Sequence, residues 1–204
     1  TRNAPGALRE ALRHHQAGKL AEARRIYDQL LAIEPEHAEA LHLAGVLNSQ
    51  MGDHDKGAAL IGRAISVRPD YAEAHHNLGN VLYQQGASQD ALGCFRRAVE
   101  LAPDYGEAHY NIASLLRLEG KLDEALDALT RAEGSGLDDA EIALERGDVL
   151  AELGRHEEAA QSYADAVARA PDEVEMLLGL AEAMRERRRI AEAAACVERA
   201  LSCE

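Results

Sequence analysis

The chain has 204 residues, of which 47% are apolar and only 3% aromatic, and this composition favours helices over sheets. The formal net charge is −14, because residues 1–102 hold 11 basic and 12 acidic side chains, whereas residues 103–204 hold 11 and 24. Such acidity disfavours non-specific binding to nucleic acids or anionic membranes, and it predicts a neutral or basic partner toward the C-terminal half.

A period of 34 residues organises the chain from its first residues onward. Prolines lie at positions 35, 69, 103 and 171, and Leu137 stands where the missing one would fall. The period divides the chain into six units, which are residues 4–37, 38–71, 72–105, 106–139, 140–173 and 174–204. Because proline does not fit a helix interior, each proline marks the passage to the next unit.

Within each unit the same residue types recur, and they predict two helices joined by a tight turn. Glycine suits the left-handed turn after the first helix, and small and bulky residues alternate where the helices pack. One such hairpin cannot bury its apolar face alone, so stacked units supply the core. The turn position holds Gly18, Gly52, Gly86, Gly120, Gly154 and Arg188, and the bulky position holds Tyr27, Ile61, Phe95, Leu129, Tyr163 and Val197.

This pattern resembles the tetratricopeptide repeat (TPR) over residues 4–204, and the clearest unit is "AEAHHNLGNVLYQQGASQDALGCFRRAVELAPDY" at residues 72–105. The resemblance implies an all-α fold, a right-handed α-α superhelix of six helix-turn-helix repeats. It also implies that the first helices line a concave face and the second helices a convex one. We therefore predict a single TPR solenoid over residues 1–204, with a truncated last repeat.

Two departures from the pattern qualify this prediction. In the fourth unit, Gly134 and Gly136 should end the second helix early. We interpret this as a local change of turn, and a hinge at residues 134–136 is the alternative. In the sixth unit, Val197 and Leu201 belong to a fairly apolar last helix. We expect either that the chain is a fragment of a longer protein, or that this repeat associates with another copy.

The register separates the histidines into two groups. His75 and His109 share the fourth position of their units, where a packing residue is expected, whereas His42 and His76 share the fifth position. One helical step turns the fifth position toward the concave face. No cysteine or acidic residue is spaced to complete a metal site with them, so we predict no metal.

Polar side chains on the first helices of the middle units predict a groove for an extended peptide or a partner helix. Asparagine is a poor helix former, and its amide offers both donors and an acceptor to a peptide backbone. Ordinary solvated polarity is the alternative. The predicted groove residues are His42, His76, Asn77, Asn80, Tyr83, Gln84, Tyr110, Asn111, Ser114 and Arg117.

Two of these units are similar to those of peptide O-GlcNAc transferases and bacterial TPR-linked transferases, on the stretches "AEAHHNLGNVL" and "GEAHYNIASLL". The resemblance implies that Asn77 and Asn111 bind the backbone of a client. Arg9, Leu43, Glu145 and Gly179 break the asparagine series, so any such ladder is confined to the middle. Glutamates at the second position of five units disfavour a clamp for acidic peptide tails.

No motif for a catalytic residue or a cofactor is present, so we predict a non-enzymatic chain without cofactors. The three cysteines form no metal or disulfide pattern, and the sequence favours a cytoplasmic location, or a periplasmic one if an upstream signal was removed. We predict a protein-interaction scaffold. The alternatives are the substrate-presenting arm of a larger glycosyl-, sulfo- or methyltransferase, and a self-assembly module.

Overall fold

The computed structural model describes residues 4–137, 140–186 and 188–202, and within them the secondary structure is helical with no strand. The all-α class predicted from the composition and the period is therefore confirmed. The helices are α1 (Ala4–Gln16), α2 (Leu20–Ile33), α3 (Ala38–Gln50), α4 (His54–Val67), α5 (Ala72–Gln84), α6 (Ser88–Leu101), α7 (Gly106–Leu118), α8 (Leu122–Gly134), α9 (Ala140–Glu152), α10 (His156–Arg169), α11 (Val174–Glu186) and α12 (Ile190–Leu201).

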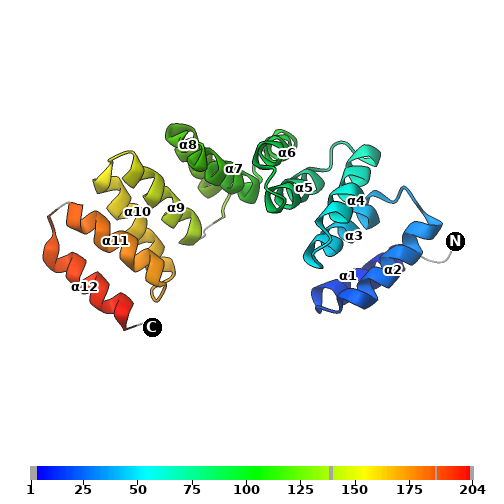
Figure 1. The fold of residues 1–204 in the computed structure, drawn as a ribbon, viewed down its shortest axis with the longest axis horizontal. Helices are drawn as coiled ribbons and strands as arrows, with labels where there is room; N and C mark the ends of the chain where they lie inside the picture. Colours follow the sequence, from blue (N-terminus) through cyan, green and yellow to red (C-terminus); the bar gives the residue numbers. More distant parts are fainter. Residues whose placement is uncertain (1–3, 138–139, 187, 203–204) are drawn as a thin grey trace. The chain divides into compact units, whose positions relative to one another are not determined.

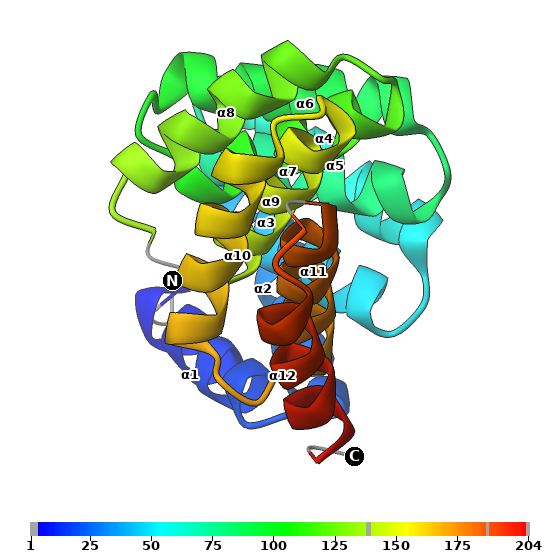
Figure 2. The same cartoon turned by 90° about the vertical axis from the view of Figure 1, so that its left-hand side faces the viewer.

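Consecutive helices form hairpins, and each hairpin corresponds to one unit of the sequence period (Figure 1). The odd-numbered helices begin at the residues that open the six units, Ala4, Ala38, Ala72, Gly106, Ala140 and Val174. Figure 2 shows the last of these hairpins, in which α11 and α12 lie side by side. The period thus locates the helix starts.

The chain divides into two compact units, Thr1–Pro103 and Asp104–Glu204, which we call the N-unit and the C-unit. The glycine pair considered as a hinge lies inside the C-unit. There α8 continues to Gly134, and Gly136 takes a left-handed φ of 86°. Residues 138–139, which close the fourth repeat, lie outside the described residues.

Within the N-unit and within the C-unit, the first helices of successive hairpins contact one another. In the N-unit α3 contacts both α1 and α5, and in the C-unit α9 contacts both α7 and α11. Among the residues that the structure describes, the second helices have no comparable contact with each other. The first helices therefore line the inner face of each stack, and the second helices its outer face.

The turn between the two helices of a hairpin requires a left-handed residue. The five glycines at this position have φ between 71° and 87°. In the sixth repeat Arg188 adopts the same conformation with a φ of 60°, although a side chain disfavours it. The conformation is therefore set by the hairpin and not by the residue that occupies the turn.

Bulky side chains on the second helices fill the space beside small residues on the first helices. Phe95 is 2% exposed, and a Cβ atom built on Gly79 would lie 2.6 Å from its Cε1 atom. The ring of Tyr163 lies against both Gly147 and Gly179, where added Cβ atoms would come within 2.6 Å and 2.8 Å. These glycines are needed for close approach, which agrees with the small and bulky pattern of the sequence.

Candidate functional site

The ten predicted groove residues lie on first helices of both units, and we describe each set within its own unit. His42 lies on α3, and His76, Asn77, Asn80, Tyr83 and Gln84 lie on α5 of the N-unit. Tyr110, Asn111, Ser114 and Arg117 lie on α7 of the C-unit.

His42 is buried in a polar network that joins the second and third repeats. Its Nδ1 lies 2.9 Å from Tyr71 Oη, and its Nε2 lies 2.8 Å from Asn77 Nδ2. The amide nitrogen can only donate, so the ring accepts at Nε2 and keeps its proton on Nδ1. Burial lowers the pKa of His42 to about 4, against an upward contribution from Glu73 and a further lowering by Arg68. Both ring nitrogens thus have partners inside the chain.

His76 was expected to face the groove, but the structure buries it. It is 9% exposed, and its ring centroid lies 5.6 Å from that of Phe95 on α6. His75, expected to pack between helices, is partly buried, and its Nε2 lies 3.0 Å from the carbonyl oxygen of Pro69. The fifth position lies at the border between groove and helix interface, so the neighbouring side chains decide its environment.

The other N-unit residues form part of the contact between repeats or lie at the surface. Ser49 Oγ donates to Gln84 Oε1 at 3.2 Å, and Nδ1 of His54 lies 2.9 Å from the same hydroxyl. Asn80 is partly buried, and Tyr83 is 50% exposed. Of the predicted N-unit residues, Tyr83 therefore presents the largest apolar surface to solvent.

The C-unit contains an open cavity of about 490 Å³ on its first helices, which we call the acidic pocket. Its apolar lining includes Leu144 and Met176, and its polar lining is dominated by carboxylates. Of the predicted groove residues, Tyr110 and Arg117 line it, while Asn111 and Ser114 on the same helix are partly buried. The acidic side chains that line it are Glu141, Glu145, Asp148, Glu173 and Glu175.

Arg117 spans from α7 to α9 and is held there by three carboxylates. Its Nε lies 2.7 Å from Glu152, and its Nη1 lies 2.9 Å from Asp148 and 3.2 Å from Glu145. Burial would lower the pKa of the guanidinium, but these carboxylates together raise it. Burial raises the pKa of Glu145, and Arg117 opposes that rise. The guanidinium therefore stays charged, and it neutralises part of the pocket wall.

Asp148 has a second anchor, which is independent of Arg117. The hydroxyl of Tyr163 on α10 donates to its Oδ1 at 2.7 Å. Burial raises the pKa of Tyr163, and the bond to Asp148 raises it further, so the phenol remains a donor at neutral pH. Because the ring is fixed between Gly147 and Gly179, the orientation of this carboxylate is set by the core.

The residues of the acidic pocket were missed at the sequence level, although the acidity of the second half was recognised. The repeat pattern identifies Glu145 only as a position that breaks the asparagine series. A signal was available, because Glu145, Asp148 and Glu152 are spaced three and four residues apart and so share one face of α9. Relating that face to Arg117 requires the stacking of the repeats.

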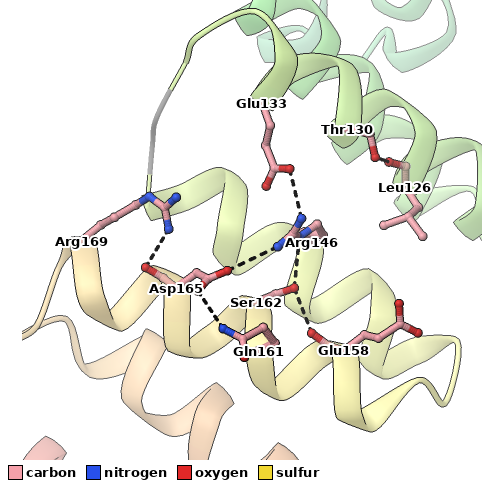
Figure 3. Close-up of polar contacts among 9 residues, drawn as sticks. All are labelled: Leu126, Thr130, Glu133, Arg146, Glu158, Gln161, Ser162, Asp165 and Arg169. Carbon is pink, nitrogen blue, oxygen red and sulfur yellow. Dashed lines mark hydrogen bonds and ion pairs between the residues drawn. The ribbon is translucent and has the colours of Figure 1, made fainter.

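A second cavity, of about 310 Å³, lies on the outer side of the C-unit between α8 and α10. Arg146 of α9 lines this cavity, and Figure 3 shows its bonds to Glu133, at 3.0 Å, and to Ser162, at 3.1 Å. The guanidinium also lies 3.6 Å from Asp165. Since acceptors on α8 and α10 already engage this arginine, we interpret the cluster as a connection between neighbouring repeats.

The described residues contain no group of three histidine, cysteine, aspartate or glutamate side chains arranged to hold a metal ion. Cys94 and Cys196 are free thiols, and Cys203 lies outside the described part of the chain. None of the helices in the described ranges is long and apolar enough to span a membrane.

Comparison with known proteins identifies the repeat. A family model described as tetratricopeptide repeat matches residues 47–106, 84–140, 110–173 and 144–203, which together cover most of the chain. No curated protein sequence gives a significant match. The family match does not test the narrower resemblance to transferase repeats, which stays a prediction.

Several solved structures share the fold at low sequence identity. A structure of MamA is 23% identical with a TM-score of 0.73, over 78% of this chain and 93% of that chain. The TPR protein YrrB, described as having an unusual peptide-binding site, is 19% identical with a TM-score of 0.75, over 87% and 92%. The pilF protein of Pseudomonas aeruginosa is 18% identical with a TM-score of 0.86, over 95% and 88%.

Proposed function

The chain belongs to the tetratricopeptide repeat family, and we propose that it is a protein-interaction scaffold whose acidic pocket binds a basic, extended segment of a partner protein. The observation that carries the proposal is the pocket itself, which is lined by carboxylates from α9, the start of α11 and the turn before it, together with the apolar side chains of Leu144 and Met176. The peptide-binding site described for YrrB, a protein of the same fold, supports a peptide as the ligand.

The chemistry of the lining suits lysine and arginine side chains. Such side chains have an aliphatic stem, which can pack on Leu144 and Met176, and a cationic end, which Glu173 and Glu175 can attract. The excess of 24 acidic over 11 basic side chains in residues 103–204 adds long-range attraction, which accelerates the encounter with a basic segment.

Replacing two pocket carboxylates is expected to weaken the binding of a basic peptide. We predict that Glu173→Gln with Glu175→Gln raises the Kd of a fluorescent peptide of alternating lysine and alanine by about tenfold, since each lost ion pair contributes up to ~1 kcal/mol. Fluorescence anisotropy measures this change, and added salt should weaken the wild-type complex.

The matched control changes the same charge on the outer face of the same unit. Glu124→Gln with Asp127→Asn alters two exposed carboxylates of α8, and we expect the Kd to change much less. Equal weakening by the two double variants would show that only net charge matters. Equally tight binding of a glutamate–alanine peptide would refute the pocket assignment.

We propose self-association through α12 as a second function, which one internal comparison favours. Val197 is 39% exposed, whereas its equivalents in the five preceding repeats are between 0% and 4% exposed. Ile190 and Leu201 on the same helix are 61% and 67% exposed. In the first, second, fourth and fifth repeats, the second helix packs against the first helix of the following repeat. An antiparallel α12 from a second copy would cover the exposed apolar side chains of α12 in a two-fold symmetric contact.

This second function predicts a concentration-dependent mass. We expect light scattering to show dimers at high protein concentration, and Ile190→Glu with Leu201→Glu to restore the monomer by placing charges in the contact. Ile33→Glu is the control, because Ile33 is a 68% exposed apolar residue that lies on α2 of the N-unit. A strictly monomeric wild-type protein would contradict self-association.

A further inference from the structure

Arg117 is the basic residue among the side chains that line the acidic pocket, and it already forms ion pairs within the protein. Its side chain is 28% exposed, and it contacts Glu145, Asp148 and Glu152 of the next repeat at 2.7–3.2 Å. It also lines the acidic pocket, so two of the carboxylates that line the pocket, Glu145 and Asp148, are engaged by a cation of the protein itself.

The carboxylates and the arginine differ in how firmly they are held. Asp148 accepts a hydrogen bond from Tyr163, whose ring is fixed between two glycines of the core. Glu145, Asp148 and Glu152 all belong to one helix, so their spacing persists without Arg117. Arg117 extends from the penultimate residue of α7, and its long side chain can rotate toward solvent at the cost of its ion pairs and of the packing of its partly buried stem.

We infer that Arg117 is a resident competitor for the cationic side chain of the partner. This inference rests on the proposed function and concerns the regulation of the same site. A lysine or arginine of the partner takes over the carboxylates of α9, and Arg117 moves into solvent. The partner's cation gains the ion pairs that Arg117 loses, so the exchange yields little net electrostatic attraction. Arg117 therefore keeps the affinity for basic segments low.

The sequence predicts that Arg117 binds the partner, whereas the inference predicts that it competes with the partner. The two predict opposite effects of removing Arg117 on the affinity. Removing a binding residue weakens a complex, whereas removing a competitor strengthens it. Without Arg117, the pocket carboxylates Glu145 and Asp148 carry their full negative charge toward the pocket, and the incoming cation displaces nothing.

The test measures the anisotropy of the labelled lysine–alanine peptide with the wild-type chain, Arg117→Gln and Arg117→Lys. We expect Arg117→Gln to bind about tenfold more tightly, with a steeper dependence on salt, and Arg117→Lys to resemble the wild type. Circular dichroism verifies that both variants are folded. Unchanged or weaker binding by a folded Arg117→Gln overturns the inference.

A second measurement uses the wild-type chain and so does not depend on the folding of a variant. The NMR signal of the Arg117 Nε–H group, assigned by its loss in Arg117→Lys, should be protected from solvent in the free protein, because Glu152 accepts from it at 2.7 Å. Saturation with the peptide should abolish that protection, and its persistence overturns the inference. Failure of the peptide to bind either the wild type or Arg117→Gln refutes the proposed function instead, and the inference with it.

Discussion

Gly79→Val is expected to destabilise the N-unit by about 3 kcal/mol, because the added side chain overlaps the ring of Phe95. A Cβ atom at position 79 would lie 2.6 Å, 2.8 Å and 2.9 Å from three atoms of that ring. Both residues belong to the packed interface of α5 and α6, so neither can yield without opening a cavity or moving a helix. Urea unfolding followed by circular dichroism measures the change in the free energy of unfolding.

The control for this substitution is another helical glycine of the same unit. Gly93 lies on α6, and a Cβ atom built there meets no atom within 4 Å. Gly93→Val should therefore leave stability unchanged or raise it by a few tenths of a kcal/mol, through helix propensity alone. Adding Phe95→Ala to Gly79→Val should cost less than the two single changes together. Additive costs would show that the ring is not what excludes a side chain at position 79.

Acidification from pH 6.5 to pH 4 is expected to remove about 3 kcal/mol of stability through His42 alone. Burial lowers the pKa of His42 from 6.5 to about 4, so between these values the unfolded chain binds a proton that the folded chain does not. Stability therefore rises with pH through this window and is complete above pH 6.5. Protonation at Nε2 would also place a donor opposite the donating amide of Asn77.

The measurement compares the free energy of unfolding of the wild type and of His42→Gln between pH 4 and pH 7. The carboxylates titrate in both proteins, so their effects cancel in the difference. We expect the stability advantage of the wild type to shrink by about 3 kcal/mol from pH 7 to pH 4. A difference that is constant across this range would show that His42 does not titrate as its burial indicates.

The sequence predicts the backbone of this protein better than it predicts the polar contacts. A period of 34 residues places the helix starts and the left-handed turns, because proline, glycine and small residues act through local backbone geometry and close packing. Even Arg188, which lacks the expected glycine, adopts the left-handed turn that the repeat requires.

The environment of the groove residues could not be predicted, because it depends on side chains one repeat away. His42 and His76 share a position, yet His42 bonds to Tyr71 and Asn77, and His76 lies beside Phe95. Likewise, the acidity of the second half was visible in the composition, but its concentration on α9 around Arg117 depends on how two repeats stack.

The hydrogen bonds between neighbouring repeats also limit how such a chain could be rearranged. His15 pairs with Gln50, Ser49 with Gln84 and Arg117 with Glu152, and each pair is separated by 35 residues. The spacing is shared, but the bonded side chains differ among these three junctions. A duplicated or transposed repeat would keep the backbone geometry and still bring together side chains that have no bond to make. Each repeat therefore carries side chains that suit its own neighbours, and exchanging repeats would remove these hydrogen bonds.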